Sequence, residues 1–218
     1  AYAEDNTENL VKIIKSCNRI LIFIMSIPIA FLTAYGRDFY AMWQPTKDAD
    51  MLQRLSLLAV GVLYVSMSIQ VLYHVFIITK KVKWNSLVIL GSGVLSSCLS
   101  LLLLKTTDLG VMVFPLSSML TGLLRNLIFT PIYAARCLKI RWNRFYGDIL
   151  LGWISIGSIV ILGNLSRMVF PVDSWIKLIL TGVVMGPLAL ALNFLIILRK
   201  EEREMVIGML KSRLKGAK

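Results

Sequence analysis

Six long apolar stretches dominate this chain and limit the folds that it can adopt. Each holds about 20 mostly apolar residues, the length that an α-helix needs to cross the hydrocarbon core of a bilayer. None alternates apolar and polar residues with the period of two that a membrane β-barrel shows. The sequence therefore predicts an all-α, polytopic transmembrane bundle of six spans within residues 1–198: Leu10–Tyr35, Leu55–Ile78, Trp84–Leu104, Val111–Tyr133, Ile149–Val169 and Trp175–Leu198.

The composition agrees with an integral membrane protein. Hydrophobic residues occupy 57% of the 218 positions and charged residues 17%, whereas soluble domains have about 45–50% and about 25%. The net charge of +12 does not indicate nucleic acid as a partner. The basic residues lie between apolar runs, and a nucleic-acid-binding domain gathers them on one polar surface.

The distribution of basic residues predicts which side of the membrane each connection faces. Lys and Arg are concentrated in alternate segments: the N-terminal one, residues 79–83, residues 136–144 and the tail at 199–218. By the positive-inside rule this side is cytoplasmic, so both ends of the chain are predicted to be cytoplasmic. Residues 199–218 are interpreted as a basic tail with an interfacial helix. The chain begins without Met, on polar residues, so we expect it to start inside a longer protein.

Arg125 is the most informative polar residue because it falls midway along the fourth stretch, beside Asn126. A central Arg costs about 2.5–3.5 kcal/mol on insertion scales, so it requires a cavity or a partner. Ser118, Thr121 and Arg125 share one helical face. Two hypotheses stay open: Arg125 binds phosphate or carboxylate in a water-filled cavity, or it reaches the basic end of the bundle or a carbonyl within it.

Two further polar faces have both a functional and a structural explanation. Lys12, Lys15 and Arg19 form an electropositive funnel at a cavity mouth or, more simply, a topology anchor. The second stretch carries hydroxyl, amide and aromatic groups that suit a sugar, and equally suit hydrogen bonds between helices. These groups belong to Ser66, Gln70, Tyr73 and His74, of which His74 is interpreted as structural because no acid accompanies it.

The sequence predicts neither an enzyme nor a cofactor. Asp38, Asp108, Asp148 and Asp173 are all expected at span ends or in loops. No nucleotide-binding motif and no set of catalytic nucleophile, base and acid is present. The cysteines Cys17, Cys98 and Cys137 have no paired spacing, so we expect neither a disulfide nor a metal site.

Four strings resemble bacterial polysaccharide flippases, the lipid-linked oligosaccharide exporters of the multidrug/oligosaccharidyl-lipid/polysaccharide superfamily. They are YGRDFYAMWQPTKDADMLQRLS (Tyr35–Ser56), TKKVKWNS (Thr79–Ser86), LLKTTDLG (Leu103–Gly110) and RNLIFTPIYAARCL (Arg125–Leu138). The resemblance runs in order over roughly residues 9–148. It implies a two-lobed helical protein that works by alternating access, of which this chain would be the C-terminal part, without the N-terminal helices.

The resemblance also implies a function and a partner. Such proteins carry undecaprenyl-pyrophosphate-linked glycans, the precursors of capsule or O-antigen, across the bacterial inner membrane. The candidate substrate contacts are then Arg125 as an anion anchor, Asn126, Gln70 and Tyr73 toward the sugar, and Lys15 and Arg19 on a recruiting surface. The alternatives are a drug or cation exporter of the same superfamily, and a membrane scaffold subunit of a glycan assembly complex. Membrane lipids are the other expected partners, and nucleic acid is not.

Overall fold

A computed structural model describes residues 7–204 and 207–208, and over these residues the chain is all-helical. The elements are α1 (Thr7–Trp43), α2 (Ala49–Val60), α3 (Leu63–Ser66), α4 (Leu72–Ile78), α5 (Val82–Thr106), the 3₁₀ turn η2 (Gly110–Met112), α6 (Val113–Leu124), the π-helical segment η3 (Arg125–Phe129), α7 (Thr130–Cys137), α8 (Tyr146–Val169) and α9 (Trp175–Ile196). The all-α prediction is confirmed.

Five helical segments are long and apolar enough to cross a membrane: α1, α5, the run Gly110–Cys137, α8 and α9. They correspond to the first, third, fourth, fifth and sixth predicted stretches. The first helix is longer than predicted, because it continues beyond Tyr35 to Trp43. Of the predicted tail, residues 200–204 and 207–208 are helical, whereas residues 205–206 and 209–218 lie outside the described part of the chain.

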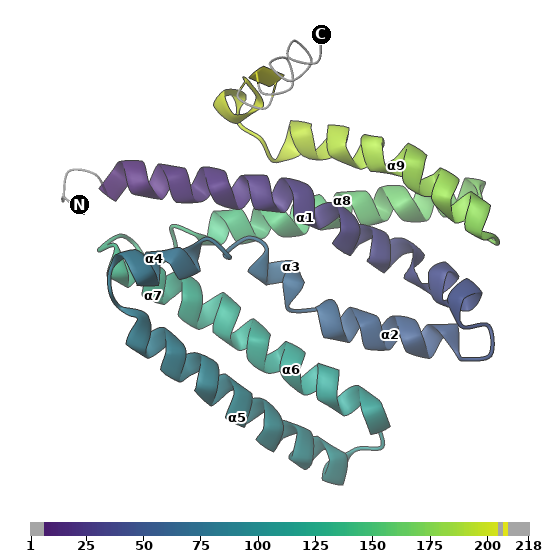
Figure 1. Ribbon diagram of the computed structural model, residues 1–218, viewed down its shortest axis with the longest axis horizontal. Coiled ribbons are helices and arrows are strands. Elements are labelled where there is room, and N and C mark those ends of the chain that lie inside the picture. The colour runs from purple at the N-terminus through teal and green to yellow at the C-terminus, as the bar shows by residue number, and fades with distance from the viewer. Residues whose placement is uncertain (1–6, 205–206, 209–218) are drawn as a thin grey trace.

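The second predicted stretch, Leu55–Ile78, is not one continuous helix. Turns at residues 61–62 and 67–71 separate α2, α3 and α4. In the second turn the N–H groups of Ser68 and Ile69 bond the carbonyls three residues back, at 3.0 and 3.1 Å. Figure 1 shows the broken segment running from the end of α1 to the start of α5, at opposite ends of the bundle. A sixth crossing therefore stays a prediction, carried by a discontinuous helix.

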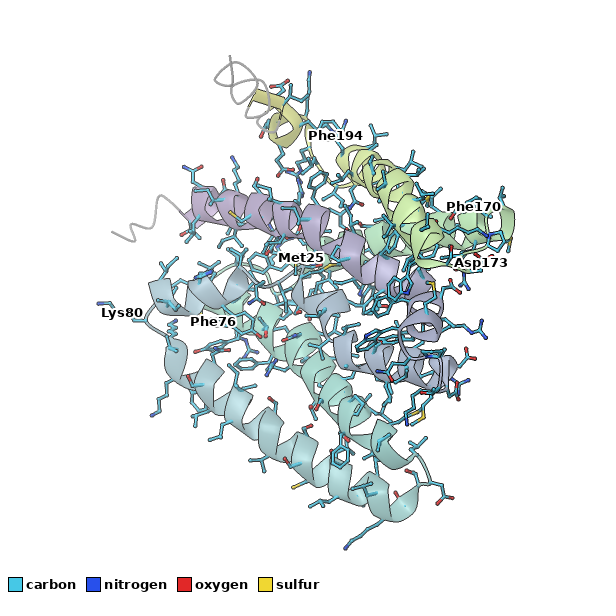
Figure 2. The ribbon with its side chains drawn as sticks, turned by 45° about the vertical axis from the view of Figure 1, so that its right-hand side comes forward. Met25, Phe76, Lys80, Phe170, Asp173 and Phe194 are labelled. Atoms are coloured by element: carbon cyan, nitrogen blue, oxygen red, sulfur yellow. The ribbon has the colours of Figure 1, made fainter. Side chains whose placement is uncertain are left out.

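Two groups of helices make up the bundle (Figure 1). The long helix α1 packs against α8, α9 and α2, whereas α5 packs chiefly against α6. The connections lie at two opposite ends. Lys80 marks the α4–α5 turn at one end, and Phe170 and Asp173 mark the α8–α9 turn at the other (Figure 2). The side chains of α5 are largely exposed, and its buried residues are Asn85 and Ser100.

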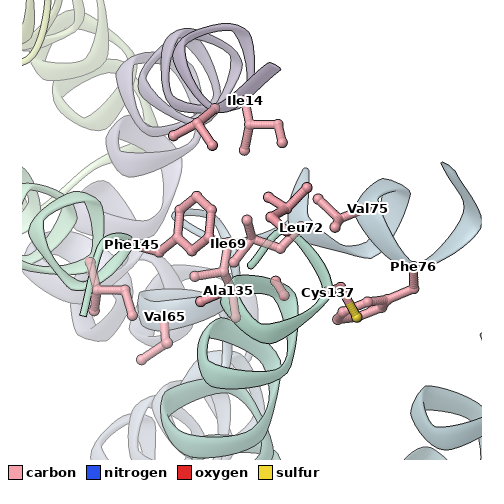
Figure 3. Packing of buried hydrophobic residues seen from close by; sticks show 13 residues of the cluster. Ile14, Val65, Ile69, Leu72, Val75, Phe76, Ala135, Cys137 and Phe145 are labelled. Atoms are coloured by element: carbon pink, nitrogen blue, oxygen red, sulfur yellow. The ribbon is translucent and has the colours of Figure 1, made fainter. Parts of the chain in front are cut away.

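The largest buried cluster lies at the end of the bundle where α3, α4 and α7 meet the N-terminal part of α1 and the start of α8 (Figure 3). Ile69, Leu72, Phe76 and Phe145 are fully buried there, and Ile14 of α1 packs on them. This cluster holds the broken second stretch against the rest of the bundle. The packing explains why short helices with no side-chain caps persist in this segment.

Small residues let α8 approach its neighbours closely. A Cβ built on Gly163 would lie 2.9 Å from the Cβ of Ala34 in α1, and one built on Gly152 would overlap the hydroxyl of Ser68 in the turn after α3. Between helices in a bilayer, lipid supplies no hydrophobic drive for association, so close packing of small residues is a main source of affinity.

The α1–α8 contact predicts a difference between two glycines of the same helix. Gly163→Leu should destabilise the protein by about 1–3 kcal/mol, because the new side chain overpacks the contact with Ala34. A Cβ on Gly157 meets no atom within 4 Å, so Gly157→Leu is the matched control and should change stability by less than about 0.5 kcal/mol. Thermal unfolding of the purified full-length protein measures both; equal midpoints would contradict this close approach.

Candidate functional site

Arg125 begins a π-helical segment between α6 and α7. The N–H of Thr130 bonds the carbonyl of Arg125, five residues back, which widens the helix by one residue. Pro131 follows immediately and has no N–H to offer the carbonyl four residues earlier, that of Leu127. The Tyr146 hydroxyl donates to this Leu127 carbonyl at 2.7 Å. A tyrosine from the start of α8 thus satisfies the backbone group that the irregular turn leaves free.

The side chain of Arg125 lies between η3 and α5 and is half-buried. Its Nη1 donates to the hydroxyl of Ser92 at 3.2 Å, and its Nε donates to Oδ1 of Asn126 at 3.3 Å. The same Asn126 oxygen accepts the hydroxyl of Tyr73 at 3.0 Å. Four side chains from α4, α5 and η3 therefore meet at one place, which we call the Arg125 site.

The charge of Arg125 is not neutralised within this site. Ser92, Asn126 and Tyr73 are uncharged, and within the described part of the chain no carboxylate lies within 4 Å of the guanidinium. A guanidinium presents five N–H donors in a planar fork that matches carboxylate and phosphate oxygens. The arrangement has the chemistry of an anion site, with Ser92 and Asn126 orienting the cation.

The structure brings only part of the predicted sugar face to Arg125. Tyr73 reaches the Arg125 site through Asn126, which is 1% exposed. Gln70 lies in the turn before α4 and is exposed; its carbonyl accepts the N–H of Tyr73 at 3.3 Å, and its side-chain amide has no hydrogen-bond partner among the residues described. Ser66, in α3, does not share a continuous helical face with Tyr73 and His74 of α4, because the turn at 67–71 intervenes. The predicted face assumed an unbroken helix, and that assumption was wrong.

The predicted stripe of Lys12, Lys15 and Arg19 divides into three different environments. Lys12 is exposed and Lys15 is half-buried. Arg19 is 7% exposed and pairs with the carboxylate of Glu202, Nη1 to Oε1 at 3.5 Å. The same Glu202 oxygen accepts the Ser16 hydroxyl at 2.7 Å. Arg19 therefore ties the start of the C-terminal helix to α1, and it shares no described contact with Arg125.

Sequence reasoning missed a buried polar group on α1. Asp148 lies at a span end, as expected, in the first turn of α8, but its burial was not predicted: it is 3% exposed, and its Oδ2 accepts Nδ2 of the fully buried Asn18 at 3.5 Å. A sequence signal for this buried group was present, because the first stretch carries polar residues at positions 15, 18 and 19. They mark the face of α1 that turns toward α8, whereas an amphipathic helix at a water surface would turn that face outward.

A second buried polar group joins α1, α8 and α9 farther along. Asn193 accepts the Ser155 hydroxyl at 2.7 Å through its oxygen. Its Nδ2 donates to the carbonyl of Phe23 and to the hydroxyl of Ser26, at 3.0 and 2.8 Å. The nitrogen of this fully buried amide donates two hydrogen bonds and its oxygen accepts one, so its role is to join helices.

Comparison with known proteins gives one informative match. The chain is 25% identical over 213 residues to the uncharacterized membrane protein EpsK of Bacillus subtilis. The alignment covers 94% of this chain and 41% of the relative, so the chain spans about two-fifths of that protein's length. Together with the five long apolar helices, the match identifies the present chain as a multi-pass membrane protein. No family model matches the sequence, and no solved structure matches it.

The hydrogen bond from Tyr146 to the π-helical segment predicts a measurable coupling with Pro131. Tyr146→Phe should cost about 1–3 kcal/mol of stability, because it leaves the Leu127 carbonyl without a donor. In a Pro131→Ala background the penalty should shrink, since residue 131 then supplies an N–H. Thermal unfolding of the four proteins of this double-mutant cycle measures the coupling.

Tyr133→Phe is the control for that cycle. The Tyr133 hydroxyl donates to the Lys81 carbonyl at 3.1 Å in an exposed position, where water replaces it, so a change below about 0.5 kcal/mol is expected. If Tyr146→Phe lowers the stability equally with and without Pro131, then Pro131 is not the reason that the Leu127 carbonyl needs the Tyr146 hydroxyl.

Proposed function

We propose that this chain is part of a transporter that moves a lipid-linked oligosaccharide across the bacterial inner membrane by alternating access, with both ends of the chain in the cytoplasm. The observation that carries the proposal is the uncompensated guanidinium of Arg125, held in the fourth span by neutral partners. The resemblance of the four sequence strings to polysaccharide flippases supports the same reading. The match to a longer membrane protein of B. subtilis agrees with a chain that forms part of a larger transporter.

The physical task of such a transporter is to carry polar groups through hydrocarbon. Each unsatisfied polar group costs several kcal/mol there, whereas the lipid tail of the substrate stays in the bilayer at no such cost. In this proposal Arg125 binds the pyrophosphate or an acidic sugar through two parallel N–H···O bonds. Asn126 and Tyr73 are adjacent hydrogen-bonding groups for the glycan, and Gln70 is an exposed amide on the same segment.

The basic residues at the start of α1 have a secondary place in the proposal. Lys12 and Lys15 remain candidates for attracting an anionic substrate. Arg19 is assigned to the structure instead, because its guanidinium is buried against Glu202.

A drug or cation exporter is the weaker candidate on the same geometry. Binding a cation requires a carboxylate that is free of internal cations. The carboxylates of Asp38 and Glu202 pair with Arg167 at 3.0 Å and with Arg19 at 3.5 Å. The buried Asp148 has no basic partner within 4 Å among the described residues, so it is the carboxylate on which this candidate would depend. The cation at the Arg125 site, by contrast, has no carboxylate partner among the described residues.

Substitution of Arg125 in the full-length protein tests the proposal. Vesicles containing the purified protein and a fluorescent undecaprenyl-pyrophosphate-linked oligosaccharide report the fraction of substrate that has crossed. Arg125→Ala should lower the transport rate about ten- to a hundredfold, the equivalent of losing a charged hydrogen-bonded contact of about 1.5–3 kcal/mol. Arg125→Lys should be intermediate, since a single ammonium keeps the charge and loses the fork.

The controls separate a substrate contact from a structural one. Arg141 is exposed, and Arg141→Ala should transport at the rate of the unmodified protein. Protein abundance in the membrane should be the same for all variants. Unchanged transport by Arg125→Ala would remove the anion site from the proposal, reduced abundance would make Arg125 structural, and no transport by the unmodified protein would favour the scaffold alternative.

A further inference from the structure

A groove between the broken second stretch, α6 and α8 has not been assigned a role. It encloses about 650 Å³, within the range of about 300–1,000 Å³ typical of small-molecule sites. Its walls are apolar side chains from three elements, and one cation, Arg54, lies at its rim. The principal wall residues are Leu57, Leu58, Tyr64, Met119, Leu123 and Trp153.

Backbone positions that lack a side chain shape this groove. A Cβ on Gly61 would overlap the sulfur of Met119, so the glycine lets Met119 lie against the break between α2 and α3. A Cβ on Gly122 would lie 2.6 Å from Val62. The break between α2 and α3 therefore packs closely against α6 at these two glycines, and the groove lies beside this contact.

The guanidinium of Arg54 forms no ion pair with a described carboxylate, and the nearby charge of Asp50 is shared with Arg37. The carboxylate one turn earlier, Asp50, is bound by Arg37 through Nε at 2.7 Å and Nη2 at 3.3 Å. This hydrogen-bonded pairing holds the pKa of Asp50 below its ordinary value. Within the part of the chain that the structure describes, no carboxylate lies within 4 Å of the exposed Arg54. The groove thus combines apolar walls with an unpaired cation at its rim.

The direction of the groove follows the membrane helices. Arg54 lies in the second turn of α2, roughly 8 Å from the start of that helix, and α2 starts at the end of the bundle where α1 ends (Figure 1). On the facing helix the lining extends from Met112 to Leu127, a rise of roughly 20 Å. One leaflet of the hydrocarbon core is about 15 Å thick. A cation at one end and an apolar channel of this length match an amphiphile whose charged group lies at the membrane surface.

We propose that this groove binds an anionic phospholipid, with its phosphate on Arg54 and one hydrocarbon chain along Leu57, Met119 and Leu123. A transmembrane helix does not fit within the groove, because a helix about 10 Å across and 20 Å long fills roughly 1,600 Å³, more than the roughly 1140 Å³ of empty space there. A sugar does not fit, because the walls offer almost no hydrogen-bonding groups and the Tyr64 hydroxyl is bonded to Thr33. The inference is independent of what the protein transports.

A second cavity provides an internal comparison. It encloses about 470 Å³ between α1 and α9, and its lining includes Pro28, Phe31, Leu178 and Gly182. No charged residue belongs to this lining. It shares the apolar character of the first groove and lacks the cation.

Native mass spectrometry of the full-length protein tests the site. The purified protein is titrated with phosphatidylglycerol or phosphatidylcholine of the same chain composition. One phosphatidylglycerol per chain should bind at the lowest concentrations. Arg54→Gln should weaken that binding about fivefold, the equivalent of one basic residue at the membrane surface. It should weaken phosphatidylcholine less, because the choline cation of that lipid offsets its phosphate. Leu57→Trp, which fills the groove, should weaken the binding of both lipids.

Two variants and one competitor complete the test. Lys105 is exposed and lies outside the groove, and Leu178 lines the second cavity, so Lys105→Gln and Leu178→Trp should bind phosphatidylglycerol normally. Inorganic phosphate at millimolar concentration should not displace the lipid. Four results would each overturn the proposal. Arg54→Gln could bind phosphatidylglycerol as well as the unmodified protein does, or Lys105→Gln could lose as much binding as Arg54→Gln. Phosphate could displace the lipid, or no lipid could bind because other parts of the protein fill the groove.

Discussion

A polar group inside a bilayer must find its partner within the protein, because hydrocarbon offers none. This constraint organises the helices of the chain. The Leu127 carbonyl, freed beside Pro131, is bonded by the hydroxyl of Tyr146 from another helix. The Asn193 amide joins α9 to α1 and α8 through three hydrogen bonds. Irregular backbone and buried amides are thus tolerated where a neighbouring helix supplies the missing hydrogen-bond partner. These hydrogen bonds determine which helices lie together.

Several charged side chains follow the same constraint, and Arg125 differs from Arg167 and Arg19. Arg167 of α8 bonds both the carboxylate of Asp38 and the carbonyl of Ala34, each at 3.0 Å. Arg19 is buried against Glu202. Arg167 therefore joins α8 to α1, and Arg19 joins α1 to the helix that contains Glu202. Arg125 is held by a hydroxyl and an amide, which orient the guanidinium without cancelling its charge. The difference in partner chemistry, and not depth alone, distinguishes the candidate anion site from the structural arginines.

The broken second stretch contributes residues to both the Arg125 site and the groove beside Arg54. Its last helix, α4, carries Tyr73 into the Arg125 site, and its first helix, α2, carries Arg54 to the rim of the lipid groove. The lining of that groove continues onto Leu123 and Leu127, on the helix that contains Arg125. The two sites therefore occupy different faces of the same α6–η3 segment. A discontinuous helix of this kind exposes backbone and side-chain groups that a regular helix would direct along one stripe.

Hydropathy alone determined the membrane class, the helical content and five of the spans, because a run of about 20 apolar residues has no other stable state in a bilayer. The sequence also showed that Arg125 falls within a span and therefore needs polar partners. Tertiary structure decided the rest. The break at residues 61–71, the inward turn of Asn18 and Arg19, and the choice of Ser92 and Tyr73 around Arg125 depend on contacts between residues far apart in the chain. A one-dimensional pattern identifies polar positions, and only the packing of neighbouring helices decides which of them meet.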